Sequence, residues 1–318
     1  MSLPLIIFFE RHWDIIPKAV MQKLLPKLEK NGYNTFCIEA PHNISSQEIF
    51  KRHHQGLKDD TLLEKQAKSY LRSLQLTKEL SEISFTELAS LIRLYVSSQH
   101  FITVAEKIKQ LPASRMLKEN FIEASKRSFM IKGIDINSKE YDHLVSLPLS
   151  ERVVALDQLE IKRIETFSQH LIFLKNEQKK GVIFACGAKH AKSLISELKK
   201  YEEEGEVLYY FPHSPSRYDE SLDDVAVLLE KNDGVLEGHT YCLTEETATL
   251  FAKRVVNDIG AKIIDHKKLE KKTSYFQYFI DCIRSPFHQG VYSGQAKGKG
   301  GEGSPPSSGI KSEFDKKI

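Results

Sequence analysis

Histidines follow several short apolar segments of this 318-residue chain within four residues. His12 follows LPLIIFF, His42 follows TFCI and His190 follows VIFAC. Two carboxylates accompany them. Glu10 stands two residues before His12, and Glu39 stands three residues before His42. An imidazole and a carboxylate together can hold a divalent transition metal, or they can act as a general base and the acid that orients it. These residue types therefore point to metal binding or acid–base catalysis.

Other histidines fit this pattern less well. His213 follows VLYYF and His266 follows AKII, but both are in polar sequence, where a solvated histidine is the more common outcome. His53 belongs to the basic run KRHH (residues 51–54), which favours a solvated surface over a pair of ligands. We therefore expect the chemistry to centre on His12 and His190.

Five apolar runs predict the strands that would position these side chains. The runs are Leu3–Phe9, Thr35–Ile38, Val182–Cys186, Val207–Phe211 and Ala261–Ile264. Most are apolar on successive residues, which is typical of parallel strands covered on both faces. Ligands of open α/β sheets bind at the carboxyl ends of the strands. We therefore expect Glu10, His12, Glu39 and His190 to converge at one edge of the sheet.

Helical patterns separate the strands and predict an α/β fold with a mostly parallel sheet flanked by helices and a helical insertion. One helix is expected from Pro17 to Lys30, with a kink or an early end at Pro26. A longer helix is expected from Leu149 to Lys179, and Phe129–Ile136 adds a further strand.

The chain divides into four segments on this basis. Residues 1–58 form the first part of the α/β core, and residues 59–127 have helical spacing without a strand signal, as expected of a helical insertion. Residues 128–284 form the rest of the core. Residues 285–318 are rich in Gly, Ser, Pro and Lys, which predicts a disordered tail whose removal leaves thermal stability nearly unchanged.

Composition narrows the class of protein further. The net charge of +3 is small for this length, so no nucleic-acid partner is expected. The four cysteines are widely spaced without a CxxC pair, which favours a reducing compartment. No stretch approaches the roughly 20 apolar residues of a membrane span, and the apolar N-terminal stretch lacks the flanks of a signal peptide. We expect a cytoplasmic protein that acts on a small molecule or a peptide, and the oligomeric state is left open.

The motifs around these residues resemble those of a superfamily that includes the TraB/Tiki proteins, the ChaN-like proteins and the erythromycin esterases. Its members carry G-x-x-H or G-E-x-H after the first strand, an acidic residue after the second, Arg-Asn on a helix, and a later G-x-x-H. Phe9–His12 is similar to the first motif, and Gly187–His190 is similar to the last. Glu39 matches the acidic residue, and Arg163 falls where the arginine of the helix lies.

The resemblance covers mainly residues 3–42 and 160–205, and it implies a hydrolase that cleaves an ester or amide bond. The catalytic residues would be Glu10, His12, Glu39 and His190. In one mechanism His12, His190 and Glu10 hold a divalent metal (Mn, Co or Zn) that lowers the pKa of a bound water toward about 7.

A second mechanism needs no metal, because His12 itself activates water and Glu39 orients it. Arg163 and His42 would bind the substrate, although an ion pair with a neighbouring acid is an equally good role for Arg163. A histidine at an exposed strand-to-helix turn contributes little packing, so replacing His190 by alanine is expected to abolish hydrolysis and to preserve the fold.

Two departures from the motifs support an alternative function. Phe9 stands where the first glycine is usual, and Ile164 stands where asparagine is usual. A bulky residue in place of glycine limits the approach of a ligand to the backbone. The alternative is therefore a non-catalytic ligand-binding protein on the same scaffold, including a haem-binding one with Tyr209 or Tyr210 as the axial ligand.

Overall fold

A computed structural model describes residues 3–76, 78, 80, 83–95, 101–178, 180–201, 207–215 and 225–284 of the chain. Residues 1–266 form one compact unit, and residues 267–318 are a second unit, of which helix is described as far as Arg284. The tail predicted for residues 285–318 lies outside the described residues.

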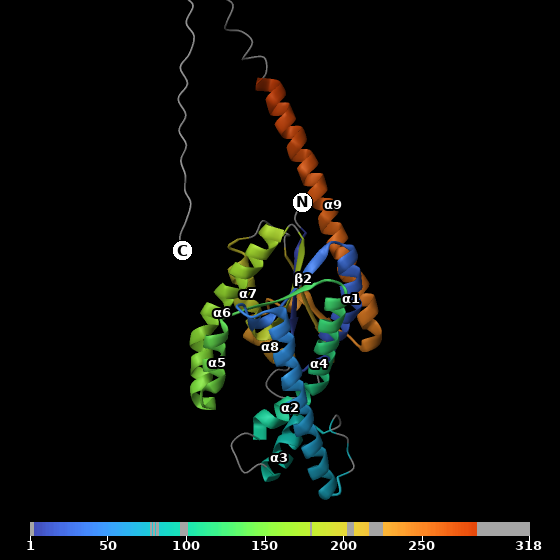
Figure 1. Cartoon of the computed structure of the whole chain (residues 1–318). Coiled ribbons are helices and arrows are strands. Elements are labelled where there is room, and N and C mark those ends of the chain that lie inside the picture. The colour runs from blue at the N-terminus through green and yellow to red at the C-terminus, as the bar shows by residue number, and fades with distance from the viewer. Residues whose placement is uncertain are drawn as a thin grey trace, which may run out of the picture. The chain divides into compact units, whose positions relative to one another are not determined.

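Six parallel strands form the sheet within the described residues (Figure 1). They are β1 (Leu5–Glu10), β2 (Tyr33–Pro41), β3 (Met130–Asp135), β4 (Gly181–Gly187), β5 (Val207–His213) and β6 (Thr240–Cys242). The order across the sheet is β3-β2-β4-β1-β5-β6. The predicted α/β fold with a parallel sheet is confirmed, and β4 lies between β1 and β2.

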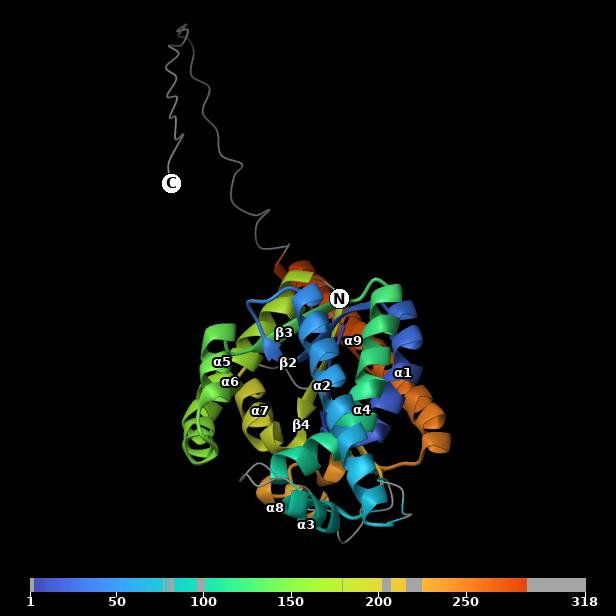
Figure 2. The same ribbon diagram turned by 60° about the horizontal axis from the view of Figure 1, so that its bottom comes forward.

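Helices cover both faces of this sheet (Figure 2). Helices α1 (Ile15–Lys30) and α4 (Phe101–Lys126) and the first part of α9 (Glu245–Arg284), as far as Ile263, pack on one face. Helices α6 (Leu149–Gln178), α7 (Ala191–Leu198) and α8 (Val225–Lys231) pack on the other. The remaining helices are α2 (Ser46–Ser73), α3 (Phe85–Tyr95) and α5 (Ser138–Ser146), with short 3₁₀ turns η1 (Ala188–His190) and η2 (Glu237–His239).

The consecutive apolar residues of the strands are explained by this three-layer arrangement. In β1, Ile6 and Phe8 join the core under α1, α4 and α9, whereas Leu5, Ile7 and Phe9 join the core under α6, α7 and α8. All five are at most 1% exposed. Because successive side chains of a strand point to opposite faces, only a sheet covered on both sides buries all of them.

The helical segment after β2 begins earlier than residue 59. Helix α2 starts at Ser46, and the side chain of Ser45 caps it by accepting a hydrogen bond from the backbone N–H of Glu48 at 3.2 Å. Helices α2, α3 and α4 share a separate apolar cluster that includes Leu71, Leu88 and Ile108. This cluster lies within the same compact unit as the sheet.

One local prediction is wrong. Ala261–Ile264 is part of helix α9, and the sixth strand is β6. A four-residue run does not distinguish a strand from a helix, and here Ile263 packs on the core while Ile264 is 54% exposed. Helix α1 continues through Pro26 to Lys30, so of the two outcomes expected at Pro26 the early end does not occur. The strand predicted at Phe129–Ile136 and the long helix after it are confirmed as β3 and α6.

Within the described part of the chain, the helices include none with the length and apolar character needed to cross a membrane.

Candidate active site

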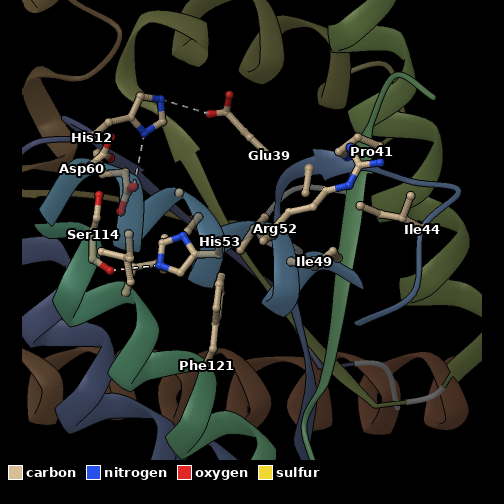
Figure 3. Close-up of a pocket in the computed structure, with 17 residues that line it drawn as sticks. His12, Glu39, Pro41, Ile44, Ile49, Arg52, His53, Asp60, Ser114 and Phe121 are labelled. Atoms are coloured by element: carbon tan, nitrogen blue, oxygen red, sulfur yellow. Dashed lines mark hydrogen bonds and ion pairs between the residues drawn. The ribbon is translucent and has the colours of Figure 1, made fainter. Parts of the chain in front are cut away.

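The carboxyl ends of β1, β2 and β4 bring the four predicted side chains together. Glu10 pairs in register with Gly187 across β1 and β4, and His12 follows β1 by two residues. His12 Nδ1 lies 3.5 Å from Glu10 Oε1, and His12 Nε2 lies 3.9 Å from Glu39 Oε1 (Figure 3). His190 Nε2 approaches the other oxygen of Glu39, Oε2, at 3.4 Å. The expected convergence at one sheet edge is therefore present.

Glu39 is the centre of this group. Its Oε1 accepts a hydrogen bond from the backbone N–H of Gly187, and its Oε2 accepts one from Arg163 Nη2 at 3.1 Å. Burial opposes ionisation of Glu39, but His190, His12 and Arg163 outweigh that effect and hold its pKa well below the usual value. Glu39 is therefore a carboxylate that anchors its neighbours.

His190 is fully buried, which corrects the expectation of an exposed turn. Its Nδ1 lies 2.5 Å from Glu160 Oε1, so each ring nitrogen faces a carboxylate. Burial favours the neutral ring, but Glu39 and Glu160 outweigh it and raise the pKa of His190. Replacing His190 by alanine would leave both carboxylates without this partner. The expectation that the fold tolerates this change rested on an exposed His190, and that premise is wrong.

Arg163 also lies behind Glu39. Its Nε donates to Asp135 Oδ1 at 3.0 Å, and its Nη2 donates to Asp135 Oδ2 at 2.7 Å as well as to Glu39. The side chain of Asp135 is fully buried and that of Arg163 is 8% exposed. The guanidinium is thus occupied by carboxylates, which supports the ion-pair role for Arg163 over substrate binding.

His12, in contrast, is open to solvent, with 51% of its side chain exposed. Lys18 on α1 fixes the turn that carries it, because Lys18 Nζ donates to the backbone carbonyl of His12 at 3.0 Å and to Glu10 Oε1 at 2.9 Å. Burial opposes ionisation of Glu10, but Lys18 and His12 together lower its pKa below the usual value. Glu10 is therefore a charged acceptor beside His12 Nδ1.

A cavity of about 380 Å³ opens in front of Glu10, His12 and Glu39. Its other walls are apolar side chains at the end of β2, together with residues of α2 and α4, among them His53 and Phe121 (Figure 3). His190, Arg163 and His42 do not line it. Of the histidines, His12 and His53 face this space.

The remaining candidates lie outside the cavity. His42 is exposed, its Nδ1 is 2.7 Å from the backbone oxygen of Asp135, and its ring lies tilted against that of His170 with 4.9 Å between centroids. His213 is buried at the end of β5, with Nδ1 2.7 Å from the backbone oxygen of Ser214. The side chain of His266 lies outside the described residues. The structure therefore gives His42 no contact with a cavity substrate.

Phe9 and the two tyrosines belong to the core. Phe9 is fully buried and stacks on Tyr209, with ring centroids 6.1 Å apart. The Tyr210 hydroxyl donates to Asp258 Oδ2 at 2.9 Å. The Phe9 side chain thus packs in the core and does not line the cavity. Neither tyrosine lines the cavity, so an axial role toward a haem bound there has no support.

The donor set does not fit a divalent metal. His190 does not line the cavity, and its Nδ1 and Nε2 lie 2.5 Å from Glu160 Oε1 and 3.4 Å from Glu39 Oε2. Arg163 lies against Glu39, and Lys18 lies against Glu10, so the charge of both carboxylates is already compensated. Among the described residues, no group of three or more His, Cys, Asp or Glu side chains is placed to hold a metal ion. The mechanism proposed below uses none.

Sequence reasoning missed several members of this site. Glu160 lies one helical turn before Arg163 on α6, and this spacing was a signal that a carboxylate would accompany the arginine. Asp135 ends β3 as Glu39 nearly ends β2. His53 was assigned to a solvated run, but it is half-buried, with Nε2 3.0 Å from the backbone oxygen of Ser114.

Gly187 makes the close approach of His12 and Glu39 to β4 possible. A Cβ at this position would lie 2.9 Å from His12 Nε2 and 3.1 Å from Glu39 Oε1. We expect Gly187→Ala to fold, since the exposed His12 ring can move away, and to lose about tenfold or more in any activity that depends on His12. Urea unfolding with kinetics checks this, and unchanged kinetics would contradict it.

Comparisons of this chain with protein-family models, curated protein sequences and solved structures give no significant match.

Proposed function

We propose that the chain is a metal-independent hydrolase that cleaves an ester or amide bond with water activated by His12. The observation that carries this proposal is a half-exposed imidazole held between two charged carboxylates, Glu10 and Glu39, at a largely apolar cavity. The resemblance to the TraB/Tiki, ChaN-like and erythromycin esterase superfamily, whose esterase branch uses such a histidine, supports the same activity.

The geometry supplies a role for each ring nitrogen of His12. Nδ1 lies 3.5 Å from Glu10 Oε1, so a proton on Nδ1 faces the negative charge of Glu10, and this tautomer leaves the lone pair on Nε2. The 3.9 Å between Nε2 and Glu39 Oε1 is too long for a hydrogen bond, so Nε2 is free to accept a proton from water. Glu39 then stabilises the imidazolium that forms.

The reaction proceeds in two proton transfers. Nε2 of His12 removes a proton from water as the oxygen attacks the carbonyl carbon, and the carbonyl π bond opens to an oxyanion. When the oxyanion reforms the carbonyl, the bond to the leaving oxygen or nitrogen breaks. His12 returns its proton to that atom, which releases an acid and an alcohol or amine and regenerates the neutral imidazole.

The buried partners of Glu39, which we call the inner group (Arg163, His190 and the Gly187 N–H), have a positioning role. Arg163 and His190 hold Glu39 from behind, and Gly187 N–H holds it from β4. Because these partners are buried and fixed, Glu39 presents its Oε1 to His12 in one orientation. A surface carboxylate would pay an entropy cost for the same geometry.

The test is hydrolysis of a panel of nitrophenyl esters and anilides by the purified wild-type chain, with and without prior treatment with a chelator. We expect turnover of at least one apolar ester, and we expect the chelator to leave the rate unchanged because no donor set here requires an ion. Loss of turnover on chelation, restored by Mn, Co or Zn, would overturn the mechanism. Binding of the same compounds without turnover would favour the non-catalytic alternative.

A further inference from the structure

Helix α2 presents one continuous face to the cavity. Six of its residues line the space at helical spacing, namely Ile49, Arg52, His53, Gly56, Leu57 and Asp60. Positions separated by three and four residues lie on one side of a helix, so this face is a wall opposite the carboxyl ends of the strands. The proposed catalytic group uses none of these residues.

Gly56 is the gap in this wall. Glycine inside a helix is unfavourable compared with alanine, and Gly56 has no turn or positive φ to explain it. A Cβ built on Gly56 would meet no atom within 4 Å, so no neighbour requires glycine here. What glycine provides at this position is empty space on the cavity side of α2.

Acceptors flank the gap on both sides. His53 Nε2 lies 3.0 Å from the Ser114 carbonyl oxygen, so Nε2 carries the hydrogen, and Nδ1 makes no hydrogen bond to any described residue. Burial lowers the pKa of His53, which favours the neutral ring and leaves Nδ1 as an acceptor. Asp60 is half-buried, and Lys107 Nζ pairs with its Oδ1 at 3.7 Å, which is longer than a hydrogen bond, so the carboxylate keeps room for a further donor.

The one cationic side chain of the wall is already occupied. Arg52 donates to Glu48 Oε1 at 3.2 Å through Nε and to Asp142 Oδ1 at 3.1 Å through Nη1. The polar atoms that this wall leaves available are therefore acceptors, on His53 and Asp60. Such a lining repels carboxylates and favours groups that donate hydrogen bonds.

We propose that the wall formed by His53, Gly56 and Asp60 selects the substrate of the hydrolase: the space over Gly56 admits its bulky apolar part, and the two acceptors bind an N–H or ammonium group on that part. The inference rests on the proposed function and names its substrate class, an apolar ester or amide that carries an amine or amide donor. Gly56 sets the size limit, and Asp60 sets the preference for charge.

The size limit is tested with Gly56→Leu, and the matched control is Lys58→Leu, which places the same side chain at an exposed position of α2 outside the cavity. Leucine is a better helix former than glycine, so the melting temperature should not fall. We expect Gly56→Leu to lower kcat/KM for a bulky phenylalkyl ester by about tenfold or more relative to the acetate ester. The control should leave this ratio unchanged.

The charge preference is tested with two esters that differ only in an ammonium or a carboxylate at the far end of the acyl chain. We expect the wild type to prefer the ammonium ester by about tenfold or more, and Asp60→Asn to reduce that preference by about tenfold. An unchanged size ratio in Gly56→Leu, or equal use of both esters by the wild type, overturns the inference and leaves the proposed function intact.

If no ester is cleaved, calorimetry with the corresponding ketones, in which a methylene replaces the ester oxygen, tests the wall separately from the hydrolase. Tighter binding of the ammonium ketone by the wild type, weakened about tenfold in Gly56→Leu, supports the wall even when the hydrolase proposal fails. Absence of binding by every ketone overturns both.

Discussion

Replacing His12 by alanine is expected to lower kcat of the proposed hydrolase by about 10²- to 10⁴-fold, the usual contribution of a general base. The loss should appear in kcat more than in KM, because the His12 imidazole acts on water and not on the ground state of the substrate. The fold should survive, since the His12 side chain is 51% exposed and makes no contact closer than 3.5 Å with Glu10 or Glu39.

A second histidine at a strand end provides the control. His42 follows β2 as His12 follows β1, but it is exposed and outside the cavity, so His42→Ala should retain the wild-type rate. Added imidazole should restore part of the activity of His12→Ala, which a purely structural role would not allow. Equal loss of activity in both variants would show that His12 is not the base.

The largest effect on stability is expected from Arg163→Met. The guanidinium donates to Asp135 through Nε and Nη2 and to Glu39 through Nη2, and the Asp135 side chain that it neutralises is fully buried. Methionine keeps much of the volume but leaves the Asp135 charge without its cation and takes one of the cationic partners from Glu39. Removing one partner of a buried ion pair costs about 3–5 kcal/mol, so the free energy of unfolding from urea titration should fall by that amount.

Arg52→Met is the matched control for Arg163→Met. Arg52 also pairs with two carboxylates, Glu48 and Asp142, but its side chain is 41% exposed. Exposed pairs contribute less than about 1 kcal/mol, so this variant should remain close to the wild type. Arg163→Lys should recover part of the loss, because an ammonium keeps the charge but not the forked geometry. An Arg163→Met variant with the wild-type free energy of unfolding would refute the claim that Arg163 stabilises the buried carboxylates Asp135 and Glu39.

The sheet could be predicted from the sequence because burial on both faces leaves a local mark. Runs such as LIIFF in β1 and VIFAC in β4 are apolar on successive residues, and each is flanked by turn residues. The prediction failed at Ala261–Ile264, where a shorter run that contains Lys262 belongs to α9. In that case the short length of the run and the helical segments beside it decide the structure, and the pattern within the run itself does not distinguish a helix from a strand.

The convergence of Glu10, His12, Glu39 and His190 followed from strand polarity alone, but their burial did not. His12 is half-exposed and His190 fully buried, although both follow a strand by a few residues. The difference comes from α6, which places Glu160 and Phe167 against His190. Contacts between segments so far apart in the chain cannot be predicted from the residue spacing within either segment. The face of α2 that lines the cavity was not predicted for the same reason.

The order of strands in the sheet also has a consequence for synthesis of the chain. β1 and β2 are made first, but they are not neighbours, because β4 pairs with both of them. Until β4 leaves the ribosome, the nascent chain presents two strand edges whose backbone N–H and C=O groups lack their final partners, and such edges pair readily with other chains. Insertion of a late strand between two early ones is a non-local step that slows folding. This protein is therefore expected to complete its core only after β4 and the core residues of α9 have been made, and to depend on protection from aggregation, such as a chaperone provides, until then.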